Sequence, residues 1–106
     1  MTQLATGDRA PEFALPDQNG RTVTLGDLCA STDKGVIVYF YPKACTPGCT
    51  KEACDFRDSL EALEAAGYAV VGISPDPQSA QAKFSDRHDL PFPLLSDADH
   101  AVMEAW

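Results

Sequence analysis

Three of the four cysteines lie close together, at Cys45, Cys49 and Cys54, and the residues around them can make one thiol unusually reactive. Thr46 and Pro47 are typical of a helix start, because threonine is a common N-cap and proline has no N–H to leave unpaired in the first turn. Cys49 then falls in the first turn, where unpaired N–H groups and the helix dipole favour a thiolate. The pattern predicts a nucleophile at Cys49, with the Thr46 hydroxyl placed to hold an incoming oxygen group or the thiolate. The alternative is a buried structural cysteine.

Cys54 follows Cys49 at a spacing that an intact helix does not bring together. Over this separation the helix rises about 7.5 Å, which places the two Cα atoms roughly 8–9 Å apart and beyond the reach of a disulfide. A bond between them therefore requires the first turn or two of the helix to unwind. A functional pair would be a conformational switch as well as a redox pair. The other interpretation is that Cys54 is a small core residue.

The remaining cysteines and the histidines carry weaker signals. Cys45 forms a C-x-x-x-C spacing with Cys49, so it is a candidate metal ligand or alternative disulfide partner, although a bystander in the loop is our default interpretation. Cys29 has no chemical neighbour in the sequence and is interpreted as core or surface filler. His88 and His100 are isolated and are not at a zinc spacing from the cysteines, which favours solvated histidines.

The elements that would position Cys49 predict an α/β domain. The apolar run Val36–Tyr41 shows no alternation, which predicts a central strand covered on both faces. The helix beginning at Pro47 ends at Gly67, a typical C-terminal stop. Its residues at helical spacing, which would face the core, are Ala53, Phe56, Leu60 and Leu63. A second apolar run over residues 68–73 predicts the next strand.

The segments on either side complete the predicted order. Asn19-Gly20 lies between short strands at residues 13–15 and 22–25, and this pair predicts a hairpin turn because both residues accept positive φ. Residues 26–35 form a polar connection before the apolar strand. The start of the chain is therefore predicted to be a β-hairpin.

Beyond the second apolar strand, two capped helices flank a short strand. Asp76-Pro77 repeats the cap-plus-proline start and predicts a helix to about His88. The prolines in residues 91–95 predict a strand at a sheet edge. Ser96-Asp97 would cap a last helix, in which Val102 and Trp106 share a face.

Size and charge exclude several classes of function. The 106 residues predict one domain, 1–106, and the composition of 44% hydrophobic and 23% charged residues is ordinary for a globular protein. The net charge of −8 argues against binding to nucleic acid or to an anionic membrane surface. Neither a membrane-spanning run nor a signal peptide is recognisable, and cysteines in such a chain fit a reducing, cytoplasmic location. Lys43, Lys51 and Arg57 gather near Cys49, and a mixed solvated surface is the alternative to a positive site.

The residues around Cys49 resemble those of a known family. Pro42, Thr46 and Cys49 match the peroxiredoxin active-site pattern P-x-x-x-T-x-x-C, and the longer string Tyr39–Cys54 is similar to the bacterioferritin-comigratory-protein (PrxQ) subgroup. Further matching stretches are Gly7–Asp17, Gly72–Asp76 and Pro93–Asp97. The resemblance extends over essentially the whole chain.

This resemblance implies a thioredoxin-like fold and thiol peroxidase activity. Cys49 would be the peroxidatic cysteine, which attacks the peroxide O–O bond and becomes a sulfenic acid. Thr46 would hydrogen-bond the peroxide and Pro42 would shield the pocket. Cys54, at the resolving position, would condense with the sulfenic acid, and a thioredoxin-type reductant would reset the resulting disulfide. No metal or organic cofactor is implied.

The chain departs from the family pattern at two points. The subgroup does not require a cysteine at Cys45. The family also continues beyond Trp106 with two strands and a final helix that supply an active-site arginine, so we expect a chain that lacks this C-terminal part. Arg57 lies two turns along the helix from Cys49, so we do not expect it to replace that arginine. Without the last hairpin, the strand Val36–Tyr41 would present an open edge, which predicts self-association through that edge.

Other functions remain as alternatives to a peroxidase. Sco-type copper-binding proteins share the fold and use C-x-x-x-C at this loop, as in Cys45 and Cys49, and thiolates suit Cu(I). An inactive fragment, or a module that binds a partner through the open strand edge, is a second alternative. A thioredoxin-type dithiol oxidoreductase is disfavoured because the sequence has no C-x-x-C.

Overall fold

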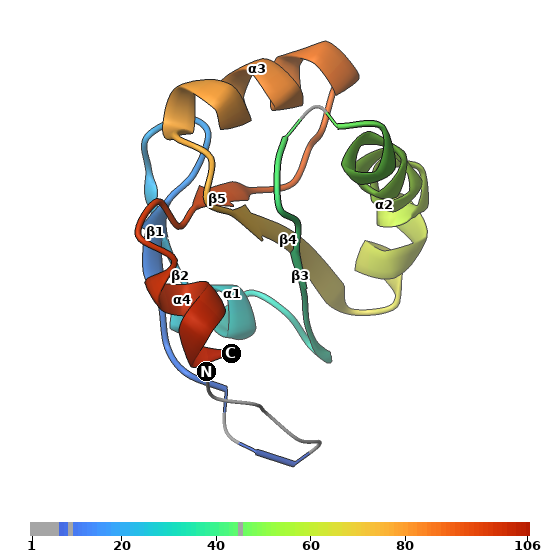
Figure 1. Ribbon diagram of the computed structural model, residues 1–106. Helices are drawn as coiled ribbons and strands as arrows, with labels where there is room; N and C mark the ends of the chain where they lie inside the picture. The colour runs from blue at the N-terminus through green and yellow to red at the C-terminus, as the bar shows by residue number, and fades with distance from the viewer. Residues whose placement is uncertain (1–6, 9, 45) are drawn as a thin grey trace.

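The fold is a small parallel sheet with a different layer on each face (Figure 1). The computed structural model describes residues 7–8, 10–44 and 46–106. Within them, β3 (Gly35–Phe40), β4 (Tyr68–Ser74) and β5 (Leu94–Ser96) form a parallel sheet in the order β3-β4-β5. Strands joined by helices in this way give the predicted α/β class.

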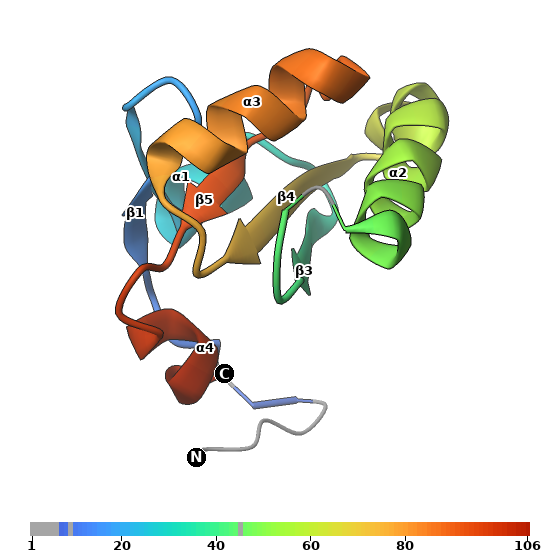
Figure 2. The same cartoon turned by 45° about the horizontal axis from the view of Figure 1, so that its top comes forward.

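Alternation along the strands divides the core into two clusters, one on each face of the sheet. On β3, Ile37 and Tyr39 pack toward the cluster that includes α2 and α3, whereas Val36, Val38 and Phe40 pack toward the other. Helices α2 (Pro47–Ala65) and α3 (Gln78–His88) cover the first face. The N-terminal hairpin, α1 (Leu25–Ala30) and α4 (Ala101–Ala105) cover the second, as the tilted view of Figure 2 also shows.

The predicted N-terminal hairpin is confirmed, but its turn differs from the expected one. β1 (Ala14–Pro16) pairs antiparallel with β2 (Thr22–Thr24). In the turn only Gly20 has a positive φ, of 84°, and Asn19 does not. The Asp17 Oδ1 instead accepts the N–H groups of Asn19 and Arg21, at 2.8 and 3.0 Å. The aspartate side chain thus supplies the hydrogen-bond acceptor for backbone N–H groups in a loop that is longer than a two-residue hairpin turn.

The polar connection expected over residues 26–35 contains a helix, α1, that the sequence did not predict. Thr24 is its N-cap, and the Thr24 Oγ1 accepts the Asp27 N–H at 3.1 Å. The helix has 6 residues and a glycine inside it, so it carries no periodic pattern long enough to detect.

The prediction that the Val36–Tyr41 run is a central strand was wrong. β3 lies at the edge of the described sheet, all of its residues are half-buried, and β4 is central. A continuous apolar run reports that both faces of a strand are covered, and β3 does face both clusters. It does not report whether both edges are paired. The later expectation that this strand has an open edge is confirmed for the residues that the structure describes.

Helix α2 follows its predicted boundaries. Thr46 is the N-cap, Pro47 is the first residue, and the chain turns after Ala66 at Gly67, whose φ is 97°. The predicted core stripe is also confirmed: Ala53 and Leu60 are buried, and Phe56 and Leu63 pack against the same cluster. Burying this stripe against the sheet fixes the rotation of the helix, and with it the position of Cys49.

The last third of the described chain confirms the predicted order with changes at the caps. The N-cap of α3 is Pro77, with no side-chain hydrogen bond, so the prediction that Asp76 caps this helix was wrong. The N-cap of α4 is His100 and not Ser96 or Asp97. The Asp97 carboxylate nevertheless accepts the N–H groups of Val102 and Met103 at 3.1 and 2.8 Å. None of the helices in the described residues is both long and apolar enough to cross a bilayer.

Candidate active site

Cys49 occupies the first turn of α2, as predicted. It is half-buried and packs against the core cluster beneath α2. The intrahelical ladder begins with the Thr50 N–H, which donates to the Thr46 carbonyl at 2.8 Å. The N–H groups before Thr50, including that of Cys49, therefore have no intrahelical acceptor and point out of the helix start. This is a favourable position for a thiolate or another anion.

Thr46 lies immediately before this turn, but its hydroxyl does not cap the helix. The Thr46 Oγ1 donates instead to the Lys43 carbonyl at 2.9 Å, and α2 has no side-chain cap. Because a hydroxyl has one proton and two lone pairs, this bond leaves the Thr46 oxygen as an acceptor. The Thr46 Oγ1 is therefore free to accept a hydrogen bond from a bound hydroxyl or hydroperoxide.

Pro42 lies two residues after the end of β3, in the loop that leads to α2. The structure places Pro42 and Lys43 at the exposed side of this loop, whereas Ala44 between them and the helix is buried. Shielding of the thiol by Pro42 therefore remains a prediction. Cys45 lies outside the described residues, so the structure does not test its predicted roles as a metal ligand, a disulfide partner or a bystander.

Cys54 lies further along α2 and is also half-buried. Both Cys49 and Cys54 are free thiols, and the helix runs without interruption through both positions. Regular helical geometry keeps their Cα atoms roughly 8–9 Å apart. The unwinding that the sequence required for a disulfide is thus required by the structure as well.

Tyr39 supplies a feature that the sequence analysis missed. Its ring stacks on Phe56 of α2, with centroids 4.7 Å apart, and its hydroxyl is buried without a hydrogen-bond partner. Burial raises the pKa of Tyr39, and the charges of Tyr41, Glu52, Cys49 and Cys54 raise it further. Tyr39 is therefore a neutral phenol beneath the cysteine-bearing face of α2. A tyrosine three residues before Pro42, the first residue of the loop motif, was the only sequence signal for it.

Gly72 of β4 makes room for the aromatic residues of this site. A Cβ atom at Gly72 would lie 2.9 Å from the Tyr39 Cζ and 3.0 Å from both the Tyr39 Oη and the Tyr41 Cε1. The φ of Gly72 is not positive, so packing and not backbone conformation requires glycine here. The central strand thus lets two large rings lie against its backbone.

A second missed feature is a hydrogen-bond network beneath the loop before Cys49. The Asp76 Oδ2 accepts the Ala44 N–H at 2.6 Å and the Ser74 hydroxyl at 2.8 Å. Gln81, which is fully buried, donates to the Ser74 Oγ at 2.8 Å and accepts from the Tyr41 hydroxyl. These residues join the ends of β3 and β4 and helix α3 to the cysteine loop.

Two of the three basic residues near Cys49, Lys51 and Arg57, are paired with carboxylates. Lys51 pairs with Asp55 at 3.0 Å, in an exposed i,i+4 ion pair. Arg57 pairs with Asp58 at 3.0 Å and donates to the His88 carbonyl at 2.7 Å, which ties α2 to the end of α3. The mixed-surface interpretation therefore describes these two residues, and Arg57 does not reach back toward Cys49.

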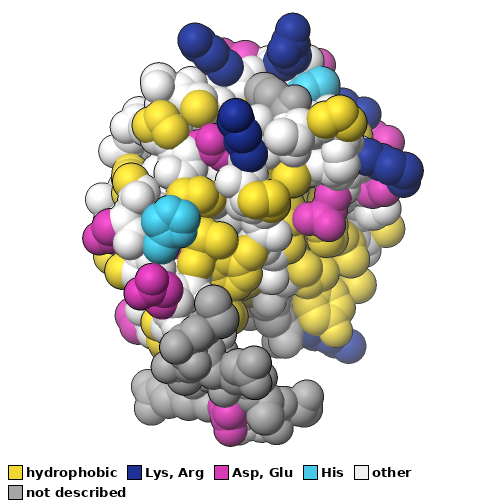
Figure 3. Space-filling view, in the orientation of Figure 1, with side chains coloured by type: hydrophobic (Ala, Val, Ile, Leu, Met, Phe, Trp, Pro, Cys, Tyr) yellow, Lys and Arg dark blue, Asp and Glu magenta, His cyan; other side chains and the backbone are white. Residues whose placement is uncertain are grey.

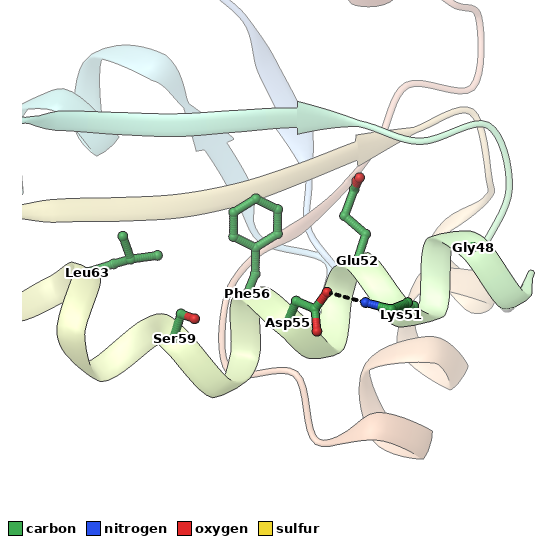
Figure 4. A pocket seen from close by; sticks show the side chains of 7 residues that line it. All are labelled: Gly48, Lys51, Glu52, Asp55, Phe56, Ser59 and Leu63. Atoms are coloured by element: carbon green, nitrogen blue, oxygen red, sulfur yellow. Dashed lines mark hydrogen bonds and ion pairs between the residues drawn. The ribbon is translucent and has the colours of Figure 1, made fainter.

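A groove of about 610 Å³ runs along α2 from the helix start (Figure 4). Figure 4 shows Glu52 and Phe56 extending from α2 toward the strands, while Lys51 and Asp55 pair along the helix. The lining residues are Gly48, Lys51, Glu52, Asp55, Phe56, Ser59 and Leu63. None of the three described cysteines lines it, so the groove neighbours the Cys49 thiol without containing it.

No cluster of three or more histidine, cysteine, aspartate or glutamate residues in the described ranges could hold a metal ion. The copper-binding alternative also required Cys45, which lies outside those ranges. The reactive groups that the structure does describe here are the thiols of Cys49 and Cys54, the start of α2 and the Thr46 hydroxyl.

Comparison with known proteins identifies the family to which this chain belongs. The family model described as AhpC/TSA family matches residues 6–106. The chain belongs to the AhpC/TSA family. Among its AhpC/TSA relatives, Peroxiredoxin Bcp of Escherichia coli K12 is 49% identical over 106 residues. A provisionally named peroxiredoxin of Mycobacterium tuberculosis is 55% identical over 105 residues. These matches include 100% and 99% of this chain, but only 66% and 65% of the lengths of the two relatives.

Solved structures of AhpC/TSA relatives agree with the fold. The crystal structure of peroxidoxin BcpB from Mycobacterium tuberculosis superposes with a TM-score of 0.92 at 44% identity, covering 97% of this chain and 66% of that one. Peroxiredoxin Q of Xanthomonas campestris gives a TM-score of 0.81 at 34% identity, covering 88% and 57%. The thioredoxin-like α/β fold and the Bcp/PrxQ resemblance that the sequence predicted are confirmed.

Proposed function

We propose that this chain carries the cysteine centre of a thiol peroxidase that reduces hydrogen peroxide and organic hydroperoxides. The observation that carries the proposal is the half-buried Cys49 thiol in the first turn of α2, where N–H groups without intrahelical acceptors surround it. The Thr46 hydroxyl, which donates its hydrogen bond to the Lys43 carbonyl, can accept a hydrogen bond from the peroxide O–H.

The first step oxidises the Cys49 sulfur. Its thiolate attacks one peroxide oxygen, an S–O bond forms as the O–O bond breaks, and two electrons pass from sulfur to oxygen. The departing oxygen takes a proton and leaves as water or an alcohol. Cys49 is left as a sulfenic acid.

The second step uses Cys54. Its thiolate attacks the Cys49 sulfur, the S–O bond breaks, and water leaves as the disulfide forms. The start of α2 has to unwind for this step, and two features lower the cost: Thr46 provides no side-chain cap, and Gly48 lies in the first turn, where a glycine weakens the helix. A thioredoxin-type dithiol in a reducing cytoplasm then returns both cysteines to thiols by exchange.

Mass spectrometry of the intact protein and of its peptides tests both steps. One equivalent of hydrogen peroxide should remove two hydrogens from the protein and link Cys49 to Cys54. Cys54→Ser should stop at a sulfenic acid on Cys49, and Cys49→Ser should not react. A wild-type protein that keeps both thiols after peroxide treatment would reject the proposal.

The open edge of β3 supports a second proposal: we infer that two copies of this chain associate through it. This strand has 6 half-buried residues, contains no proline or charged residue, and has no partner on its outer side among the described residues. Figure 3 shows hydrophobic side chains gathered on the face where Figure 1 draws β3. An edge of this kind is a template for pairing with another strand, and a second copy offers an identical one.

Sedimentation over a range of concentrations tests this association. We expect a dimer at high concentration. Val38→Lys should weaken it, because lysine on an edge strand opposes pairing. Ala62→Lys, which adds the same charge at an exposed position of α2, should not. A well-folded wild-type monomer at high concentration would reject the association.

A further inference from the structure

The cysteine loop is attached to the body of the domain by one carboxylate. In the described residues of the loop, 42–44 and 46, the Ala44 N–H is the only group that hydrogen-bonds to a side chain outside the loop, and its acceptor is Asp76 at 2.6 Å. The other side-chain bond, from Thr46 to Lys43, stays within the loop. Asp76 lies between β4 and α3, 32 residues from Ala44 in sequence.

The direction of each hydrogen bond in the network is fixed by its chemistry. Gln81 places its Nε2 2.9 Å from the Leu95 carbonyl, which can only accept, so the Gln81 Oε1 must accept from the Tyr41 hydroxyl. The same Nε2 donates to the Ser74 Oγ, whose proton then points to Asp76. The side-chain hydrogen bonds from Tyr41 through Gln81 and Ser74 therefore run toward the Asp76 carboxylate, while the Asp76 N–H donates back to the Ser74 Oγ at 3.3 Å.

Asp76 is thus a terminal acceptor, and a carboxylate is the side chain suited to that role. It accepts the Ser74 hydroxyl from the core side and the Ala44 N–H from the loop side. Hydrogen bonds to a charged acceptor are shorter and stronger than neutral ones. Gln81 and Tyr41 are almost fully buried, so the support behind Asp76 is rigid.

We propose that Asp76 is a positioning residue for the thiol at Cys49. It acts through Ala44 by holding the loop in the closed shape that presents Thr46 and the start of α2 to a peroxide. Peroxide attack requires this geometry, whereas disulfide formation requires the same loop and helix start to open. Asp76 therefore favours the first step and opposes the second. This inference rests on the proposed peroxidase function.

Asp76→Asn tests the inference, because it keeps the shape of the side chain and removes its charge. We expect the rate constant for oxidation of Cys49 by hydrogen peroxide to fall about tenfold, in line with the sensitivity of oriented reactions to small displacements. Conversion of the sulfenic acid to the disulfide should be unchanged or faster. The rate of alkylation by iodoacetamide at high pH, which needs a thiolate but no oriented loop, should be unchanged.

Asp97→Asn is the matched control. Asp97 follows the neighbouring strand β5 and also accepts backbone N–H groups, but those of Val102 and Met103 in α4. This variant should lower the melting temperature and leave the oxidation rate of Cys49 unchanged. Equal losses in peroxide and iodoacetamide rates in Asp76→Asn would show a general structural role and overturn the inference, as would an unchanged peroxide rate.

Hydrogen exchange of the Ala44 amide separates the inference from the proposed function. In the wild-type protein this amide should be protected relative to the amide of Lys43, and in Asp76→Asn the protection should be lost. An unprotected Ala44 amide in the wild type overturns the role of Asp76, whatever the peroxide reactivity. A protected Ala44 amide in a protein that does not react with peroxide rejects the function and leaves Asp76 as a loop anchor alone.

Discussion

Gly72→Ala is the substitution whose effect on the site can be calculated most directly. The added Cβ would lie 2.9 Å from the Tyr39 Cζ and 3.0 Å from the Tyr41 Cε1, so at least one ring has to move. Tyr41 is 2% exposed and its hydroxyl is held by Gln81, so it has little freedom to do so. Gly72→Ala therefore forces an extra methyl group into a packed interface between β4 and two aromatic rings.

Overpacking of this kind costs about 1–3 kcal/mol, and the reduced entropy of the unfolded chain returns about 0.4–1 kcal/mol because the φ of Gly72 suits alanine. The net expected loss is about 1–2 kcal/mol in the free energy of unfolding. For a domain of this size that corresponds to a fall of roughly 5–15 °C in melting temperature. Urea denaturation followed by circular dichroism measures the first quantity, and a thermal scan the second.

Gly48→Ala is the control for this prediction, because a Cβ at Gly48 meets no atom within 4 Å. It should be neutral or stabilising, as alanine is the better helix former. If Gly72→Ala were as stable as the wild type, the close packing of Tyr39 and Tyr41 on β4 would be refuted, and with it the rigid support that we assign to the cysteine loop.

Three further outcomes are expected. Gly48→Ala should stabilise the first turn of α2 by about 0.5–1 kcal/mol and slow disulfide formation by up to about fivefold, as stopped-flow fluorescence would show. Tyr39→Phe removes a buried hydroxyl without a partner, so the free energy of unfolding measured by urea denaturation should stay unchanged or rise by about 1 kcal/mol. Tyr41→Phe should lower the free energy of unfolding by about 1–3 kcal/mol, because the Gln81 Oε1 loses its hydrogen-bond donor. Burial raises the pKa of Tyr39 and Tyr41, so the unfolded chain releases these protons at lower pH than the folded protein does. The free energy of unfolding should therefore be unaffected by these groups below about pH 10 and fall as the pH rises further. The fall should be less steep in Tyr39→Phe, which lacks one of the two phenols.

The parts of the site that depend on local sequence were predictable. Thr46-Pro47 and Gly67 set the limits of α2, and the spacing of its apolar residues set the face that it buries. The first-turn position of Cys49 follows from these alone. These predictions were correct because caps, prolines and helical periodicity depend on residues that are close together in the sequence.

The parts that depend on distant residues were not predictable. Asp76-Pro77 carries the pattern of a helix cap, but the Asp76 carboxylate turns to Ala44, a partner that only the parallel pairing of β3 with β4 brings near. The edge position of β3 was obscured for a related reason, because its residues report the two packed faces and not the unpaired edge. Both outcomes are decided by tertiary partners, which local patterns do not encode.

These two kinds of support act on opposite sides of Cys49. Behind it, the loop is held through Ala44 by Asp76 and a buried network; ahead of it, the first turn of α2 has no side-chain cap and contains Gly48. A thiol that must first meet a peroxide in a fixed geometry and then reach Cys54 needs both properties. A stronger cap on α2 would hinder the second step, and a looser loop would hinder the first. We therefore expect Asp76→Asn to slow the oxidation of Cys49 more than disulfide formation, and Gly48→Ala to slow disulfide formation more than the oxidation. Loss of overall stability cannot produce this pair of opposite effects.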